Sequence, residues 1–197
     1  MSGRSYPALE RALDGKITLL LAGRSSTRFP YACCHEEHTH VERVNRALNS
    51  FVRPGDVIAI VNLLGDMGWD HVDVLDSFAA SMQARNASVV LFGDNPSLTG
   101  EPVRCKSNHD LCSLNAEADT RRRANDALIL DFAAGRPNVF GFFQSDLWTP
   151  PSGESFWGNV PGTTTNAYYD SQHLLIAGAK YLSPYICTAF SEWGLFQ

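Results

Sequence analysis

The residues best suited to chemistry in this sequence are an acid and a histidine three positions apart, close to the C-terminal end. Asp170 precedes His173 where a loop is expected to turn into the last helix. A carboxylate at this spacing can cap that helix and also orient the neighbouring imidazole. A histidine held in this way acts as a general base toward a hydroxyl group. The alternative is structural: an N-capping aspartate followed by a surface histidine in the first helical turn.

A second polar group, residues 33–40 (CCHEEHTH), contains side chains that bind zinc. If this segment is helical, His35 and His38 share one face, as do Glu36 and His40. The spacing matches no closed zinc framework, so we favour a solvated polar loop leading into the helix that follows. We expect no metal and no other cofactor.

The five cysteines allow disulfides. Cys105 and Cys112 bracket a short polar loop that a disulfide closes easily, and Cys33, Cys34 and Cys187 could supply a second bridge and one remaining thiol. Oxidised pairs would indicate a lumen or the cell exterior, and the alternative is five reduced thiols in a cytosolic protein.

Composition narrows the class of protein. With 197 residues, 44% of them hydrophobic, the chain is long and apolar enough for one globular domain, 1–197. A net charge of −5 argues against nucleic acid as a partner, because neutralising phosphates requires many spread Lys and Arg side chains. No apolar run is long enough for a transmembrane helix, and the N-terminal segment has no hydrophobic signal region.

Helical and extended patterns alternate along the chain. Strands are expected at 16–22, 56–61, 88–92 and 139–143, and helices at 7–13, 41–51, 72–82, 116–134 and 174–190. This alternation predicts an α/β fold with a doubly wound, mostly parallel sheet and helices on both faces. Segments 62–68, 93–97 and the chain from Gln144 onward should then converge on one rim beyond the carboxyl ends of the strands. The helix at 116–134 is expected to expose a charged face made of Glu117, Asp119 and residues 121–123 (RRR).

Aromatic side chains gather in the long loop expected at 144–169. They either form a platform for sugars or pack the loop onto the core. The residues are Trp148, Phe156, Trp157, Tyr168 and Tyr169.

The order of these features resembles the SGNH hydrolase superfamily of serine esterases and acyl-ester transferases. The likeness is greatest to the SGNH domains attached to membrane acyltransferases that O-acetylate surface glycans. Residues 170–174 (DSQHL), with the helix that follows, are similar to the family's Asp-x-x-His-Leu segment and its final helix. Residues 54–58 resemble the start of a family strand, 89–96 the next strand with its proline-bearing loop, and 105–112 the cysteine-rich insertion.

The resemblance implies a flavodoxin-like fold and acyl transfer through a serine. Asp170 and His173 would be the acid and base of a Ser-His-Asp triad. Asn62, after the strand at 56–61, would be a donor to the oxyanion, with a turn-forming asparagine as the alternative. The substrates would be carbohydrates with O-acyl groups, most often acetyl, and no cofactor is implied.

The family's nucleophile lies in a Gly-Asp-Ser-His segment at the end of its first strand, and this sequence contains no Gly-Asp-Ser. Residues 23–26 (GRSS) follow a strand but carry Arg24 in place of the acid and lie in the wrong register, and Ser2 lacks the rigid turn that a nucleophile needs. The helix start at 7–9, which follows the nucleophile in the family, comes almost at the N-terminus here. We therefore expect a domain truncated before its first strand.

On this interpretation, the nucleophile and a membrane acyltransferase domain lie upstream in a longer protein, on the luminal or extracellular side of a membrane. The alternative is a catalytically inactive, SGNH-derived domain that binds glycans. A third option is a cytosolic metalloprotein that uses the histidines at 35–40.

Overall fold

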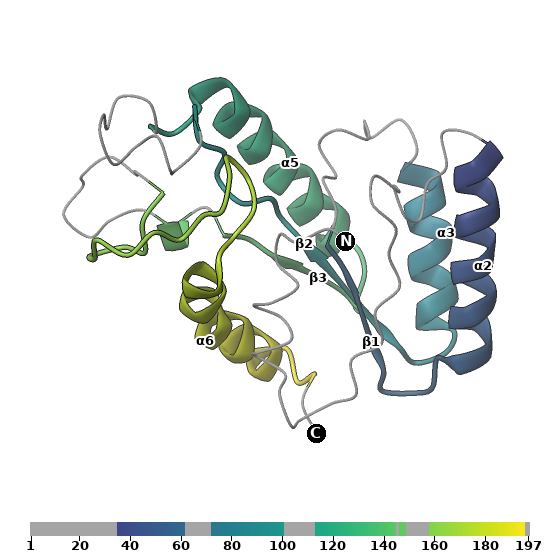
Figure 1. Ribbon diagram of the computed structural model, residues 1–197. Helices are drawn as coiled ribbons and strands as arrows, with labels where there is room; N and C mark the ends of the chain where they lie inside the picture. The colour runs from purple at the N-terminus through teal and green to yellow at the C-terminus, as the bar shows by residue number, and fades with distance from the viewer. Residues whose placement is uncertain (1–34, 62–71, 101–112, 145, 149–157, 196–197) are drawn as a thin grey trace.

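The computed structural model describes residues 35–61, 72–100, 113–144, 146–148 and 158–195. Helices and strands alternate through these ranges, as the sequence predicts (Figure 1). They are α2 (His35–Phe51), β1 (Val57–Ile60), α3 (Val72–Gln83), β2 (Ser88–Phe92), α5 (Ala116–Ala134), β3 (Val139–Phe142), the 3-10 turn η4 (Asp146–Trp148) and α6 (Ile176–Glu192). The helix expected at 7–13 and the strand at 16–22 lie outside the described residues, as does the question of a missing first strand.

The three described strands form a parallel sheet in the order β1-β2-β3. Val57 is paired with Ser88, and Val89 with Val139. Each parallel neighbour is reached through a helix, and helices pack on both faces of the sheet, which gives a flavodoxin-like α/β architecture.

Both faces of the sheet are covered, which is why its strands are continuously apolar. Alternate residues of β2 point to opposite faces. Val89 and Leu91 pack with side chains of α3 and α5, and Leu48 of α2 packs against the same cluster. Val90 and Phe92 pack with the buried face of α6.

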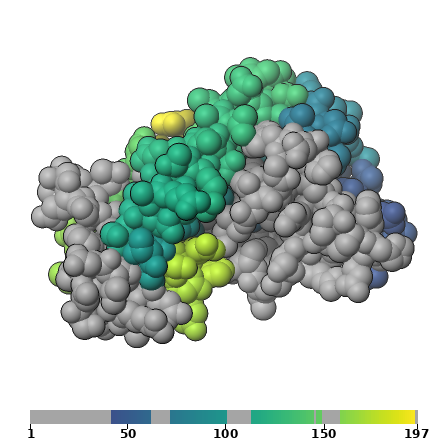
Figure 2. Space-filling model, turned by 90° about the horizontal axis from the view of Figure 1, so that it is seen from above, coloured from purple at the N-terminus to yellow at the C-terminus, as the bar shows by residue number. Residues whose placement is uncertain are grey.

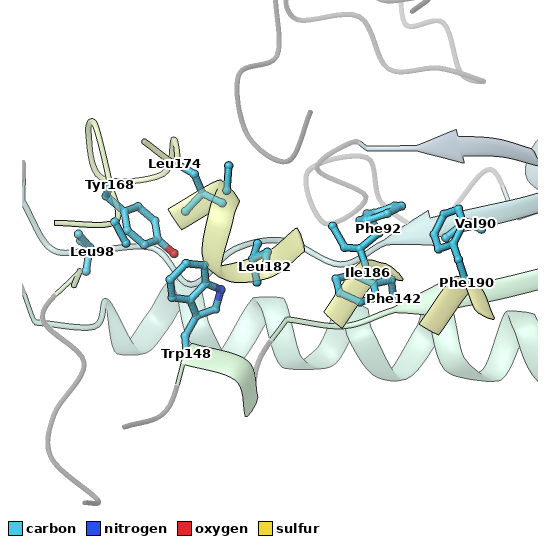
Figure 3. Close-up of a cluster of buried hydrophobic side chains, with 12 residues drawn as sticks. Val90, Phe92, Leu98, Phe142, Trp148, Tyr168, Leu174, Leu182, Ile186 and Phe190 are labelled. Atoms are coloured by element: carbon cyan, nitrogen blue, oxygen red, sulfur yellow. The ribbon is translucent and has the colours of Figure 1, made fainter. Parts of the chain in front are cut away.

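The cluster beneath α6 extends beyond the sheet into the loops. Figure 3 shows it as a long row, from Val90 and Phe190 at one end to Trp148, Tyr168 and Leu98 at the other. Trp148 and Tyr168 are fully buried, with ring centroids 5.6 Å apart. These two aromatic residues therefore pack a loop onto the core and present no surface to a sugar.

Helix α2 corrects two expectations. It begins at His35, so residues 35–40 are helical and do not form a polar loop. The helical spacing of Val44, Leu48 and Phe51 predicts that all three lie on one apolar face, but Phe51 is exposed at the last position of the helix, just before the turn at Pro54 and Gly55 that leads to β1.

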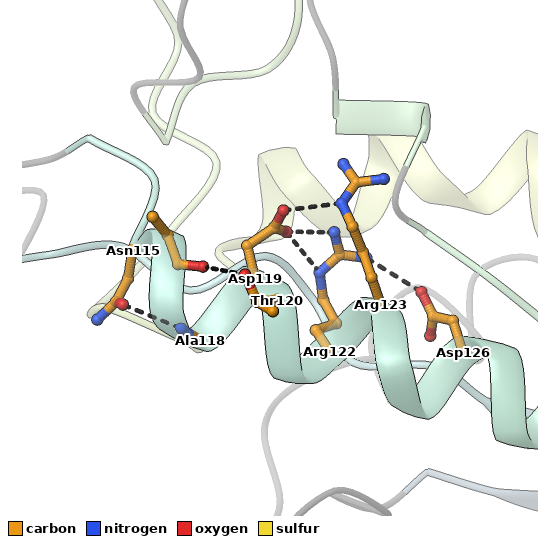
Figure 4. A network of polar contacts seen from close by, with 8 residues as sticks. Asn115, Ala118, Asp119, Thr120, Arg122, Arg123 and Asp126 are labelled. Atoms are coloured by element: carbon orange, nitrogen blue, oxygen red, sulfur yellow. Dashed lines mark hydrogen bonds and ion pairs between the residues drawn. The ribbon is translucent and has the colours of Figure 1, made fainter.

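Helix α5 corrects a third expectation, because part of its charged segment faces inward. Arg122, only 4% exposed, lies between Asp119 and Asp126 (Figure 4). Its Nη1 donates to Asp126 Oδ2 at 3.1 Å, its Nε donates to Asp119 Oδ1 at 3.0 Å, and Nε of Arg123 donates to Asp119 Oδ2 at 2.9 Å. Asp119, Arg122, Asp126 and Ile129 are three or four positions apart and therefore lie on the same, inward face of the helix. The ion pairs with the two acids neutralise the buried guanidinium of Arg122.

The outer side of α5 is exposed and runs across the face seen in Figure 2. Within the described ranges, no helix combines the length and apolar character needed to cross a membrane.

Candidate active site

The candidate site is the tip of a tight hairpin that precedes α6. Tyr168 and Leu174 form an antiparallel bridge, and the backbone N–H of Tyr169 donates to the carbonyl of His173 at 2.7 Å. Helix α6 begins later, at Ile176, and has no side-chain cap. The expectation that Asp170 caps the last helix is therefore wrong, because the hairpin separates this acid from the helix. The alternative of a surface histidine in the first helical turn fails for the same reason.

Asp170 instead organises the hairpin tip. Its Oδ1 accepts hydrogen bonds from the backbone N–H groups of Gln172 at 2.8 Å and His173 at 2.7 Å. This is an Asx-type turn, in which a short acidic side chain replaces a backbone acceptor. The other carboxylate oxygen, Oδ2, lies 2.5 Å from Nδ1 of His173. One carboxylate therefore fixes both the backbone and the imidazole.

The electrostatics of this contact define the tautomer of the histidine. Burial alone would raise the pKa of Asp170, but hydrogen bonds from the backbone of Gln172 and His173 and from the imidazole outweigh it and hold that pKa below its usual value. An ionised carboxylate can only accept, so Nδ1 of His173 must donate and, in the neutral ring, the lone pair lies on Nε2. The side chains are 38% exposed for His173 and 32% for Asp170, so solvent reaches both.

The loop after β2 holds this hairpin tip at the carboxyl end of the sheet. The backbone N–H of Leu98 donates to the carbonyl of Ser171 at 2.9 Å. Nδ2 of Asn95 donates to the carbonyl of Gln172 at 3.4 Å. Segments 93–98 and 170–173, far apart in the sequence, therefore meet where the rim was expected.

The loop after β3 reaches the same rim. Nε2 of the fully buried Gln144 donates to the carbonyl of Gly93 at 2.9 Å. The hydroxyl of Tyr181, on α6, donates to the carbonyl of Leu147 in η4. Asn62 and the rest of the expected segment 62–68 lie outside the described residues, so the oxyanion donor stays a prediction.

The sequence patterns did not indicate a role for Asn95 at this site. Asn95 precedes a proline and has the pattern of an ordinary turn residue, yet only 6% of it is exposed. Tyr169, next to Asp170, is 71% exposed, in contrast to its buried neighbour Tyr168. The aromatic pattern alone did not separate the exposed ring from the buried one. Phe156 and Trp157 lie outside the described residues.

The described residues support neither the expected disulfides nor a metal site. Cys187 on α6 carries a thiol and is half-buried, and Cys33, Cys34, Cys105 and Cys112 lie outside the described residues, so the expected disulfides are not supported. Among the described residues, no group of three or more potential ligands could hold a metal ion. The side chains of residues 35–40 lie outside that search.

Comparisons with known proteins support the fold. No model of a protein family matches the sequence, and no curated protein matches it. Among solved structures, the periplasmic domain of a lipopolysaccharide acetyltransferase from Salmonella ser. Paratyphi A is similar, with a TM-score of 0.57 and 16% sequence identity. The aligned region covers 79% of this chain and 63% of that domain, so the chain spans less than two thirds of its neighbour. At this identity the likeness shows a shared α/β fold.

Proposed function

We propose that this chain is an SGNH-type domain for acyl-ester chemistry, in which Asp170 and His173 are the acid and the base. The observation that carries the proposal is the 2.5 Å contact between Asp170 Oδ2 and His173 Nδ1 at the carboxyl end of the sheet. The fold likeness to an acetyltransferase domain supports a role related to acyl transfer. The Asp-x-x-His-Leu segment, which resembles the family's motif, agrees with it.

In the proposed mechanism, Nε2 of His173 removes the proton from a serine hydroxyl as its oxygen attacks the acyl carbonyl. The ionised carboxylate of Asp170 stabilises the imidazolium that forms. When the tetrahedral intermediate breaks down, the imidazolium returns the proton to the departing sugar oxygen, leaving an acyl-serine. A second hydroxyl or water then accepts the acyl group by the reverse sequence. Asn62 is the proposed donor to the oxyanion.

The serine in this proposal belongs to a segment outside the printed sequence, because the sequence contains no Gly-Asp-Ser. We further propose that the domain operates beside a membrane acyltransferase domain, on the luminal or extracellular side of a membrane. The proposed substrates are O-acetylated carbohydrates, a class suggested by the family resemblance and by the glycan named in the neighbour's title.

Ester hydrolysis by the purified chain tests where the nucleophile lies. With p-nitrophenyl acetate we expect no turnover that depends on His173, so wild type and His173→Ala should hydrolyse the ester equally slowly, since the base lacks its serine. If wild type instead turns the ester over, and if both His173→Ala and one of Ser25→Ala and Ser26→Ala abolish that turnover, the nucleophile is a serine of this chain. That result would leave the esterase assignment intact.

The sequence of the transcript upstream of the Met1 codon tests the enzyme itself. We expect an in-frame Gly-Asp-Ser, and the longer protein should hydrolyse acetyl esters in a manner abolished by His173→Ala. A longer protein whose hydrolysis is unaffected by that substitution would overturn the proposal.

A glycan-binding domain without catalysis is the second candidate, favoured by the absent Gly-Asp-Ser and by the exposed ring of Tyr169 beside the hairpin tip. This candidate predicts a translation start at Met1 and affinity for acetylated oligosaccharides that His173→Ala does not change.

A further inference from the structure

We infer that Asn95 is a positioning residue that holds the hairpin tip carrying Asp170 and His173. This inference rests on the proposed function for its catalytic meaning, but its geometry stands by itself. Asn95 lies in the loop after β2, and its side chain reaches the carbonyl of Gln172, 77 positions later in the chain.

Three peptide planes separate Asp170 from His173, and the last two of them, Ser171–Gln172 and Gln172–His173, are each held by two hydrogen bonds. A peptide unit is rigid, so its carbonyl and the N–H of the next residue move together. In the first of these two planes, the N–H of Gln172 donates to Asp170 Oδ1 at 2.8 Å, and the carbonyl of Ser171 accepts from the N–H of Leu98 at 2.9 Å. This plane is held at both ends.

The second plane is held in the same way, with Asn95 in the place of a backbone donor. The N–H of His173 donates to Asp170 Oδ1 at 2.7 Å, and the carbonyl of Gln172 accepts from Asn95 Nδ2 at 3.4 Å. If the Asn95 contact is lost, this plane can rotate, and the rotation displaces the N–H and Cα of His173. The imidazole would then lose its alignment with Asp170 Oδ2.

Asn95 is a buried polar residue, and the hydrogen bond that its amide donates to the carbonyl of Gln172 explains why a polar side chain occupies this position. Its Oδ1 is buried and has no hydrogen-bond partner among the described residues. A buried polar atom without a partner costs about 1–3 kcal/mol, which a leucine of similar size would avoid. The orientation of the amide is also determined, because the opposite one would place Oδ1 against the carbonyl of Gln172. What the asparagine contributes is therefore the Nδ2 donor.

The chain offers a matched control in Asn138. Its Nδ2 donates to the carbonyls of Ala79 at 3.1 Å and Ala87 at 3.2 Å, and its Oδ1 is also buried without a partner among the described residues. Asn138 immediately precedes β3, whereas Asn95 follows β2, so the two amides lie at opposite ends of the parallel sheet. Both substitutions remove the same chemistry, but only one is near the hairpin tip.

The experiment compares Asn95→Leu with Asn138→Leu by NMR of the full chain. In wild type we expect a downfield signal for the proton on His173 Nδ1 and a carboxyl 13C titration of Asp170 below the usual range. In Asn95→Leu the Nδ1 proton signal should be lost to exchange with water, and the Asp170 titration should move upward because its donors loosen. Asn138→Leu should lower the urea midpoint and change neither signal.

Unchanged Asp170 and His173 signals in a folded Asn95→Leu protein would overturn the inference, and Asn95→Ala replaces that variant if it fails to fold. Asp170→Asn separates this failure from that of the proposed function. If the Nδ1 proton signal survives in Asp170→Asn, the acid does not hold the base and the proposed function fails. If it disappears there but persists in Asn95→Leu, only the positioning role is lost.

Discussion

At the scale of single residues, the carboxylate of Asp170 has two tasks that require different oxygens. Oδ1 accepts two backbone N–H groups, whereas Oδ2 faces the imidazole. Because the turn fixes Oδ1, the direction of Oδ2 is fixed as well, and Oδ2 in turn orients the imidazole. This separation of tasks makes Asp170→Asn informative, because asparagine can reproduce the first task but not the second.

In Asp170→Asn we expect the turn to remain and the imidazole to change its tautomer. The amide oxygen can still accept both N–H groups, but the NH₂ group would face Nδ1 and would require an acceptor there. The proton should therefore move to Nε2, with a loss of about 1 kcal/mol in the free energy of unfolding. Nitrogen-15 shifts of the His173 ring measure the tautomer, and a ring that keeps its Nδ1 proton would contradict the expectation.

Substitution of Tyr169 tests whether its exposed ring meets a sugar. Tyr169→Ala should weaken binding of an acetylated oligosaccharide up to about tenfold, because stacking on an aromatic face is worth about 0.5–1.5 kcal/mol. Tyr169→Phe should bind nearly as well as wild type. Tyr185→Ala, which removes a partly exposed ring of α6, is the control. Calorimetric titration measures each affinity, and equal losses in the two alanine variants would argue against a platform at Tyr169.

At the scale of elements, the hairpin and α6 approach each other closely at Gly178. A Cβ atom on Gly178 would lie 2.5 Å from the carbonyl oxygen of Ala167, which is a backbone atom that cannot turn aside. The carbonyl of Ala167 also accepts the N–H of Leu175 at 2.8 Å, so the same group joins the hairpin to the start of the helix. A displacement here would be transmitted to the hairpin tip.

Gly178→Ala should therefore destabilise the protein by about 1–3 kcal/mol, as overpacking usually does. The backbone amide signals of residues 170–173 should shift as well. Gly135→Ala is the control, because a Cβ there meets nothing within 4 Å, and it should stay within about 0.5 kcal/mol of wild type. Urea unfolding gives both values. Equal stability of the two variants would mean that the helix can move away from the hairpin without loss.

The elements show what sequence patterns can and cannot predict. Continuous apolar runs located all three described strands, because a strand that is buried on both faces is apolar throughout. Helical spacing of apolar residues located the long helices. The pairing of Asp170 with His173 followed from their spacing. Their hairpin was misread as the start of α6, because an Asx turn and a helix N-cap use the same residue types.

Contacts between segments that are distant in the sequence could not be predicted from local sequence patterns. The burial of Arg122 depends on which face of α5 meets the sheet, and the periodicity of a charged segment does not reveal that face. The role of Asn95 depends on a carbonyl 77 positions away. Such polar contacts require the fold to be known first.

At the scale of the whole molecule, the charges of α5 make stability dependent on pH. Burial alone would raise the pKa of Asp119, but hydrogen bonds and charge interactions with Arg122 and Arg123 outweigh it and lower that pKa. A folded-state pKa below the unfolded one adds stability above the unfolded value, and this stability is lost as the pH falls through the folded value. Asp170, whose pKa is also lowered, contributes in the same direction.

We expect the free energy of unfolding to fall between about pH 5 and pH 2, where such carboxylates become protonated. Asp119→Asn should lose about 1–3 kcal/mol at neutral pH, because it removes one of the two acids that pair with the buried guanidinium of Arg122. On acidification, the free energy of unfolding of this variant should then fall by less than that of wild type. Protonation of Asp170 should account for part of the fall that remains. Urea unfolding across this pH range measures both curves. Parallel curves would show that Asp119 does not contribute to the acid sensitivity.

The bond between the N–H of Leu98 and the carbonyl of Ser171 has a consequence for divergence. Every amino acid except proline supplies that donor, and every amino acid supplies that acceptor, so substitutions at either position preserve the attachment. The backbone structure of this rim can thus be conserved even when most of its side chains are substituted. A descendant that kept Asp170 but exchanged His173 would retain this backbone arrangement, and a different reactive side chain could occupy position 173.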